Sequence, residues 1–130
     1  MVVAERGTSY KQGIELEMAR MSPAGFAMYA SEGRWLLARH LAYLNREVME
    51  TVCRPSQRLI VSMPPRHGKS EFISKYLPPW YLGAFPHRKV MLASYEADFA
   101  ASWGWKAREI AAQWWPVVFN RKVREMPSAA

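Results

Sequence analysis

Hydrophobic residues recur along much of the chain with the spacing of helices. Residues 22–31 begin with a Ser-Pro pair, which is typical of an N-cap followed by proline at the first helical position. In residues 34–52, apolar side chains recur at three- and four-residue steps with charged side chains between them, which predicts an amphipathic helix. Two more helices are predicted, one beginning near residue 69 and ending before Pro78, and one over residues 96–114.

Two short segments lack this spacing and favour strands instead. Residues 58–63 and 89–94 are rich in β-branched and apolar side chains and are bounded by turn-forming residues. Because a predicted helix follows each segment, we expect the two strands to be parallel and buried. The predicted fold class is therefore α/β, with parallel strands and flanking helices, preceded by an N-terminal helical segment.

These elements divide the chain into three parts. Residues 1–21 are polar and weakly patterned, and we expect them to form a loose arm or a short helix. Residues 22–56 form a helical lead-in segment, and residues 57–130 contain both strands. The length of 130 residues suits one domain. A parallel sheet, however, usually has about four or more strands, so we expect the chain to be part of a domain.

Net charge is unevenly distributed. The chain carries 18 Lys and Arg against 11 Asp and Glu, a net charge of +7. Residues 1–55 hold seven basic and six acidic residues (+1), and residues 56–130 hold eleven and five (+6). A basic C-terminal part fits a polyanionic partner such as double-stranded DNA or a nucleotide. A solvated basic surface explains the same charge equally well.

Composition also excludes several classes of protein. A single cysteine, Cys53, rules out an internal disulfide framework and a multi-cysteine metal site. Asp98 is the only aspartate, so the clustered aspartate ligands of two-metal nuclease cleavage are not encoded here. The longest apolar run, residues 76–85, is interrupted by prolines and too short to span a membrane. The N-terminus lacks the apolar core of a secretion signal, and we expect a cytoplasmic, membrane-free location.

Candidate chemistry concentrates in the run Met63-Pro-Pro-Arg-His-Gly-Lys-Ser70. A phosphate-binding P-loop reads G-x-x-x-x-G-K-[ST] between a strand and a helix. Gly68, Lys69 and Ser70 fit its last three positions, and Met63 stands where the first glycine would be. We therefore expect residues 57–130 to be an incomplete P-loop NTPase core that binds ATP and Mg²⁺. The alternative is a tight turn with a solvated lysine.

Each position of this loop has a predicted role. Gly68 lets the backbone approach phosphate oxygens, and Lys69 places a positive charge on the β- and γ-phosphates. The Ser70 hydroxyl can ligate Mg²⁺. His67 and Glu71 contribute to the phosphate site, Glu71 through its backbone amide only, because the amides of residues 67–71 lie at a helix N-terminus. For the His67 side chain, contact with solvent is favoured over contact with phosphate.

The motifs MPPRHGKSE, PPWYLGAFPHRKVMLASYEADFA and KAREI together resemble the large terminase subunit of tailed bacteriophages, over about residues 22–125. That family tolerates loss of the first P-loop glycine. The resemblance implies a motor ATPase that drives double-stranded viral DNA into a preformed capsid in the cytoplasm of the bacterial host cell. It implies the portal protein, the small terminase subunit and other large-subunit copies as partners, and a separate C-terminal nuclease domain.

The resemblance assigns Arg66 a catalytic role, the sensing or stabilisation of the γ-phosphate, against the alternative of a surface arginine. Gln57 could touch adenine or simply end a turn. Ser94 and Tyr95 would end the second strand beside the ligand, where a structural role is favoured for Tyr95. Four aromatic residues could stack on bases, although packing is preferred for at least three of them. They are Trp80, Tyr81, Trp114 and Trp115.

The acidic half of an ATPase site is missing from the sequence. A Walker B strand should end in aspartate, yet the only imitation, residues 90–96, has Ser94 at that position. We therefore expect an N-terminal fragment of a packaging ATPase that binds nucleotide weakly and does not turn over ATP. The alternative is a small basic nucleic-acid-binding or adaptor protein that retains a P-loop relic. A small kinase would need lid arginines and an acidic substrate residue, which are not visible.

Overall fold

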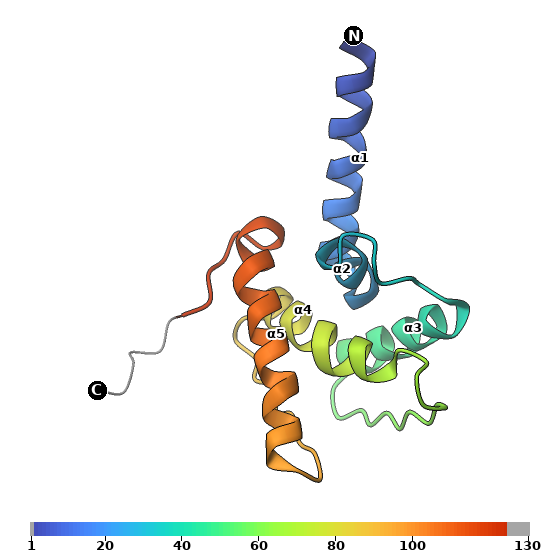
Figure 1. Cartoon of the computed structure of the whole chain (residues 1–130), viewed down its shortest axis with the longest axis vertical. Helices are drawn as coiled ribbons and strands as arrows, with labels where there is room; N and C mark the ends of the chain where they lie inside the picture. The colour runs from blue at the N-terminus through green and yellow to red at the C-terminus, as the bar shows by residue number, and fades with distance from the viewer. Residues whose placement is uncertain (1, 125–130) are drawn as a thin grey trace.

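The computed structural model describes residues 2–124, with side chains from residue 9 onward. The elements follow in the order α1 (Val2–Met21), α2 (Pro23–Ala30), α3 (Arg39–Cys53), η1 (Glu71–Tyr76), α4 (Leu77–Ala84) and α5 (Ala97–Val118). Figure 1 shows α1 projecting from one end of the molecule, with the other helices gathered at its base. Residues 2–21, expected as a loose arm or a short helix, thus form one long helix.

The predicted α/β fold is wrong. All regular elements within residues 2–124 are helical, and neither a strand nor a sheet occurs among them. Segments 58–63 and 89–94, expected as buried parallel strands, are irregular. They also expose large apolar side chains, since Ile60 is 94% and Met91 92% exposed. The partial P-loop NTPase core expected at residues 57–130 is accordingly replaced, over its described part, by η1, α4, α5 and irregular connections.

The physical reason is that a strand needs a neighbour to pair its backbone groups, whereas a helix pairs them internally. In segment 58–63, exposure alternates: Val61 and Met63 lie half-buried against the core, and Ile60 points into solvent. This one-sided contact accounts for the strand-like pattern of the sequence. The described part of the chain supplies no adjacent strand, so the segment stays irregular.

Helix α2 begins where the Ser-Pro pair predicts. Ser22 is the N-cap, and its Oγ accepts a hydrogen bond from the Gly25 amide at 3.1 Å. Pro23 occupies the first turn, where its missing N–H costs nothing. The Ala24 amide donates to Asn45 Oδ1 of α3 at 3.0 Å. The start of α2 is thereby joined to the middle of α3.

Helix α3 begins at Arg39, five residues later than residue 34, where its periodicity starts. The residues between are held by Trp35, whose backbone amide donates to Ser31 Oγ at 2.9 Å. The Trp35 ring is buried and stacks on Phe72, with 5.6 Å between ring centroids. The buried ring and this hydrogen bond hold the residues that lead into α3.

The third predicted helix does not stop at Pro78. Helical residues run without interruption from 69 to 84, first through the π-helical segment η1 and then through α4. The wider turn of η1 lets Pro78 and Pro79 fall at the beginning of α4. In a regular α-helix a proline ring would collide with the carbonyl four residues before it, and a wider turn at this point eases that collision.

Helix α5 likewise continues past its predicted end, through Pro116 to Val118. Two long-range hydrogen bonds hold this end. The Trp115 indole Nε1 donates to the Pro79 carbonyl at 2.8 Å, and Arg20 Nε donates to the Val118 carbonyl at 2.6 Å. The end of α5 is thus joined to both α4 and α1.

The core lies where α2, η1, α4 and α5 meet. Its largest fully buried side chains include Phe26, Phe72, Trp80 and Val118. Helices α1 and α2 approach so closely that a Cβ on Gly25 would collide with the Met18 carbonyl. The packed helices position the loop that precedes residue 69.

Candidate functional site

The candidate phosphate-binding loop, residues 64–70, leads directly into the helix that starts at residue 69. It contains two residues with left-handed backbone, Arg66 (φ 62°) and Gly68 (φ 81°). Glycine adopts this conformation without steric cost, whereas for a residue such as arginine it costs about 1–2 kcal/mol. Ser70 is already in the right-handed helical region, with φ −68° and ψ −36°. The backbone therefore reverses sharply just before Lys69 and Ser70.

Helix α3 holds this loop in place. His40 Nε2 lies 2.9 Å from the His67 carbonyl oxygen, which can only accept, so the imidazole N–H donates. The His67 Nδ1 atom in turn lies 2.8 Å from the Pro65 carbonyl oxygen. A Cβ on Gly68 would come within 3.3 Å of Leu41 Cδ1, so the loop also packs tightly on α3. Sequence reasoning gave His40 no role here, because the contact joins positions 27 residues apart.

The following helix is anchored by Phe72. Its side chain is fully buried, and its backbone amide donates to the Gly68 carbonyl at 3.0 Å. One helical face thus points into the core, while Ser70 and Glu71 stay exposed and Lys69 is half-buried. The first amides of a helix lack intrahelical acceptors and can bind an anion.

Two cations border the loop without ion-pair partners among the described side chains. Arg66 is exposed, and neither it nor Lys69 takes part in an ion pair there. By contrast, Lys75 one turn further on lies 3.6 Å from Glu71 Oε1. The charges of Arg66 and Lys69 are therefore available to an anionic ligand, and that of Lys75 is partly compensated.

Other residues singled out from sequence lie apart from this loop. Gln57 Nε2 donates back to the Pro55 carbonyl at 3.2 Å, as expected for a residue that ends a turn. Ser94 and Tyr95 precede α5 instead of ending a strand. Tyr95 is 90% exposed, and its ring centroid lies 6.0 Å from that of Phe99.

The four aromatic residues proposed for base stacking contact other parts of the protein. Trp80 is buried and donates from Nε1 to the Arg20 carbonyl at 3.1 Å. Trp115 donates to Pro79, and the Tyr81 hydroxyl accepts from Arg88 Nη1 at 2.8 Å. Trp114 packs edge-on against Tyr29, with 5.5 Å between ring centroids.

The loop presents chemical groups that can contact a phosphate. Lys69, the exposed Ser70 hydroxyl and the helix-start amides are suitable for phosphate and for one ligand of Mg²⁺. Among the described residues, no group of three or more His, Cys, Asp or Glu side chains could complete a metal site. Neither of the two cavities described here includes a residue of 64–71.

Comparisons with family models, with curated proteins and with solved structures returned no match for this chain. Across the described residues, no helix combines the length and the apolarity that crossing a membrane requires.

Proposed function

We propose that residues 64–71 bind the phosphates of ATP, and that the chain contributes the phosphate-binding part of a viral DNA-packaging ATPase. The observation that carries the proposal is the Pro-Pro-Arg-His-Gly-Lys-Ser run, with left-handed Gly68 immediately before a helix that starts at Lys69. This arrangement places helix-start amides next to Lys69, which takes part in no ion pair among the described side chains.

In this proposal each side chain has a distinct role. Lys69 binds the β- and γ-phosphates, and the Ser70 hydroxyl binds a Mg²⁺ ion that offsets phosphate charge. The amides of residues 67–71 surround the phosphate oxygens. Arg66 lies at the loop's exposed tip, where its guanidinium can contact the γ-phosphate. His40 positions the loop through its hydrogen bond to the His67 carbonyl.

Hydrolysis is not part of what we propose for this chain alone. Attack on the γ-phosphate requires a carboxylate or amide that orients water. The only acidic residue of the loop region, Glu71, faces Lys75 in an ion pair. We therefore expect binding without turnover, and we assign DNA translocation, with its portal and small-subunit partners, to the assembled machine that the sequence resemblance implies.

The test is a titration of the chain with a fluorescent ATP analogue in the presence of Mg²⁺. Loss of a charge-assisted hydrogen bond costs about 1.5–3 kcal/mol, so Lys69→Ala should weaken binding by about tenfold to hundredfold. Lys75→Ala is the matched control, because it removes the same charge from the same helix but from a residue paired with Glu71. Equal affinity of the wild type and Lys69→Ala, or equal losses in both variants, would contradict the proposal.

A second candidate function is supported by the charge distribution. Residues 56–130 carry a net charge of +6, and the described residues of this part, 56–124, form helices and irregular segments without a sheet. A small basic DNA-binding or adaptor protein would have this character. It predicts double-stranded DNA binding that weakens steeply with salt, survives Lys69→Ala and ignores ATP. Fluorescence anisotropy with labelled DNA at several salt concentrations distinguishes the two candidates.

A further inference from the structure

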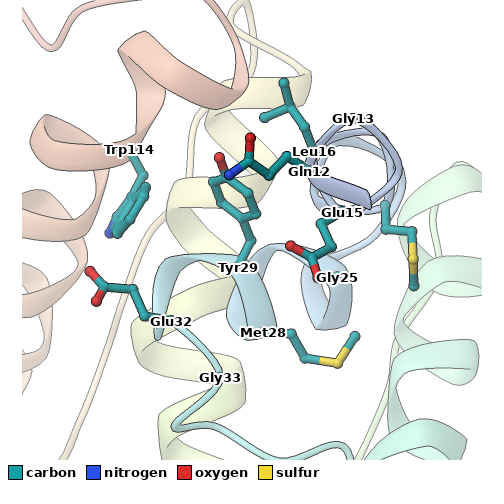
Figure 2. A pocket seen from close by; sticks show the side chains of 11 residues that line it. Gln12, Gly13, Glu15, Leu16, Gly25, Met28, Tyr29, Glu32, Gly33 and Trp114 are labelled. Carbon is teal, nitrogen blue, oxygen red and sulfur yellow. The ribbon is translucent and has the colours of Figure 1, made fainter. Parts of the chain in front are cut away.

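A large open cleft lies between α1, α2 and α5, away from the phosphate loop. Its volume is about 980 Å³, at the upper end of the range for small-molecule sites. The residues that line it come from α1, from α2 and the turn that follows, and from α5. They are Gln12, Gly13, Glu15, Leu16, Met18, Gly25, Met28, Tyr29, Glu32, Gly33 and Trp114. Figure 2 shows this lining from close by.

The charge of the cleft is opposite to that of the chain. The protein carries a net charge of +7, yet the only charged residues in the lining are the carboxylates of Glu15 and Glu32. In the view of Figure 2, the two carboxylates lie on either side of Tyr29, and that of Glu32 points toward Trp114. An anion such as ATP is disfavoured here, and a cation is favoured.

Both carboxylates also lack an internal partner. Three other glutamates form ion pairs with basic residues close in sequence: Glu17 with Arg20, Glu47 with Arg46, and Glu71 with Lys75. Among the side chains that the structure describes, Glu15 and Glu32 take part in no ion pair and no hydrogen bond. Their negative charge is thus left for an outside group.

The aromatic wall of the cleft, formed by Tyr29 and Trp114, also differs from other rings of the structure in its partners. Lysine or arginine side chains lie over the rings of Tyr43, Tyr76, Tyr81, Phe85 and Trp103. No described cation lies over Tyr29 or Trp114, which meet edge to face with an interplanar angle of 75°. An aromatic face attracts ammonium groups through its quadrupole. Two half-buried rings beside two carboxylates therefore complement a cation that has an apolar body.

The backbone fixes the position of Glu32. It has a left-handed conformation, φ 54°, at the end of α2, where glycine or asparagine is usual. Its amide donates to the Tyr29 carbonyl and that of Gly33 to the Met28 carbonyl, both at 3.0 Å. The same turn therefore holds the backbone of Glu32 close to Tyr29.

We propose that this cleft binds a small organic ammonium ligand. The cationic head lies against Tyr29 and Trp114 and between the two carboxylates, and the apolar body contacts Leu16 and Met28. The proposal is independent of phosphate binding at residues 64–71, because the two sites share no residue and prefer opposite charges.

The test compares acetylcholine with its uncharged carbon analogue, 3,3-dimethylbutyl acetate, in NMR titrations of the full chain. The two probes have nearly the same shape, so their difference measures the contribution of the charge. We expect the uncharged probe to bind about tenfold more weakly or worse. Absence of acetylcholine binding at millimolar concentration, or equal binding of the two probes, overturns the proposal.

Variants then locate the site. Glu15→Gln with Glu32→Gln should weaken acetylcholine binding by about tenfold, and Trp114→Leu by about threefold or more. Glu50→Gln is the matched control, because it removes one exposed carboxylate from α3, outside the cleft. Glu15 and Glu32 are exposed, so their isosteric changes leave the fold intact. The single variants Glu15→Gln and Glu32→Gln are compared with this control. If Glu50→Gln weakens acetylcholine binding as much as either of them does, the assignment to this cleft is overturned.

Discussion

Two sets of apolar residues in this molecule meet opposite environments. The apolar residues of helices α2, η1 and α4 lie in the core, where Phe26 and Phe72 are both fully buried. In the two irregular segments, 58–63 and 89–94, no apolar residue is fully buried, and Ile60 and Met91 are 94% and 92% exposed. Hydrophobicity is similar in the two sets, so hydrophobicity alone does not decide burial.

The difference shows what each kind of backbone requires. A helix satisfies its own amides and carbonyls and needs only one packing face. An irregular or extended segment must find partners for its backbone before it can be buried. In the described chain, the helices pack against one another, whereas no strand pairs with the backbone of the two irregular segments.

The test with the largest expected effect replaces one residue of each set by alanine. Phe72→Ala removes a fully buried ring that stacks on Trp35, and it should lower the free energy of unfolding by about 3–5 kcal/mol. Ile60→Ala, its matched control among the irregular residues, should change stability by less than about 0.5 kcal/mol. Urea unfolding followed by circular dichroism measures both. Similar losses in the two variants would mean that Ile60 is buried in solution.

A second test concerns how closely the helices pack. Gly25→Ala places a methyl group against the Met18 backbone carbonyl and should destabilise the protein by about 1–3 kcal/mol. Gly104→Ala in α5 is the control, because a Cβ there meets nothing within 4 Å. That change should stabilise the helix by up to about 1 kcal/mol. Thermal melting distinguishes the two signs, and a melting temperature of Gly25→Ala equal to or above that of the wild type would argue against the close α1–α2 contact.

Helices α2, α3 and α5 were predictable from the sequence, whereas the predicted sheet does not occur among the described residues. The Ser22-Pro23 start of α2 follows from local capping chemistry, which a sequence displays directly. The continuation through Pro78 depends on the π-helical turn before it, and the late start of α3 accompanies the burial of Trp35. Strand pairing depends on a distant neighbour, which a strand-like pattern does not reveal.

In the candidate site, too, local features were predictable from the sequence and long-range contacts were not. The loop motif and its glycine were visible as a local pattern, and the structure gives Gly68 the left-handed backbone that glycine permits. The role of His40 was not visible, because its contact with the loop arises only from the packing of α3. Function at the loop stays a prediction that rests on the motif.

A third test concerns the junction between the packed helices and the irregular region. His40→Ala removes the hydrogen bond to the His67 carbonyl and should cost about 1 kcal/mol. Amide hydrogen exchange should speed up within residues 65–70 and stay unchanged in α4. His87→Ala, a change at another exposed histidine, is the control. If exchange in the loop were the same in both variants, α3 would not be what holds the loop.

The smallest expected effect comes from the exposed apolar residues themselves. The double variant Ile60→Lys with Met91→Lys should leave the free energy of unfolding within about 0.5 kcal/mol of the wild type. It should reduce self-association, because exposed apolar patches promote aggregation. Analytical ultracentrifugation over a range of concentrations measures this. A large loss of stability would show that the two segments are packed after all.

The π-helical turn at Glu71–Tyr76 makes the length of this helix adjustable. Such a turn takes up one extra residue in a single wider turn, so the residues on either side keep the faces they would have in a regular α-helix. Deletion of one residue within the turn would therefore restore regular winding while Lys69, Ser70 and Trp80 kept their orientations. The segment between the loop and the core can thus change its length by one residue without turning one against the other.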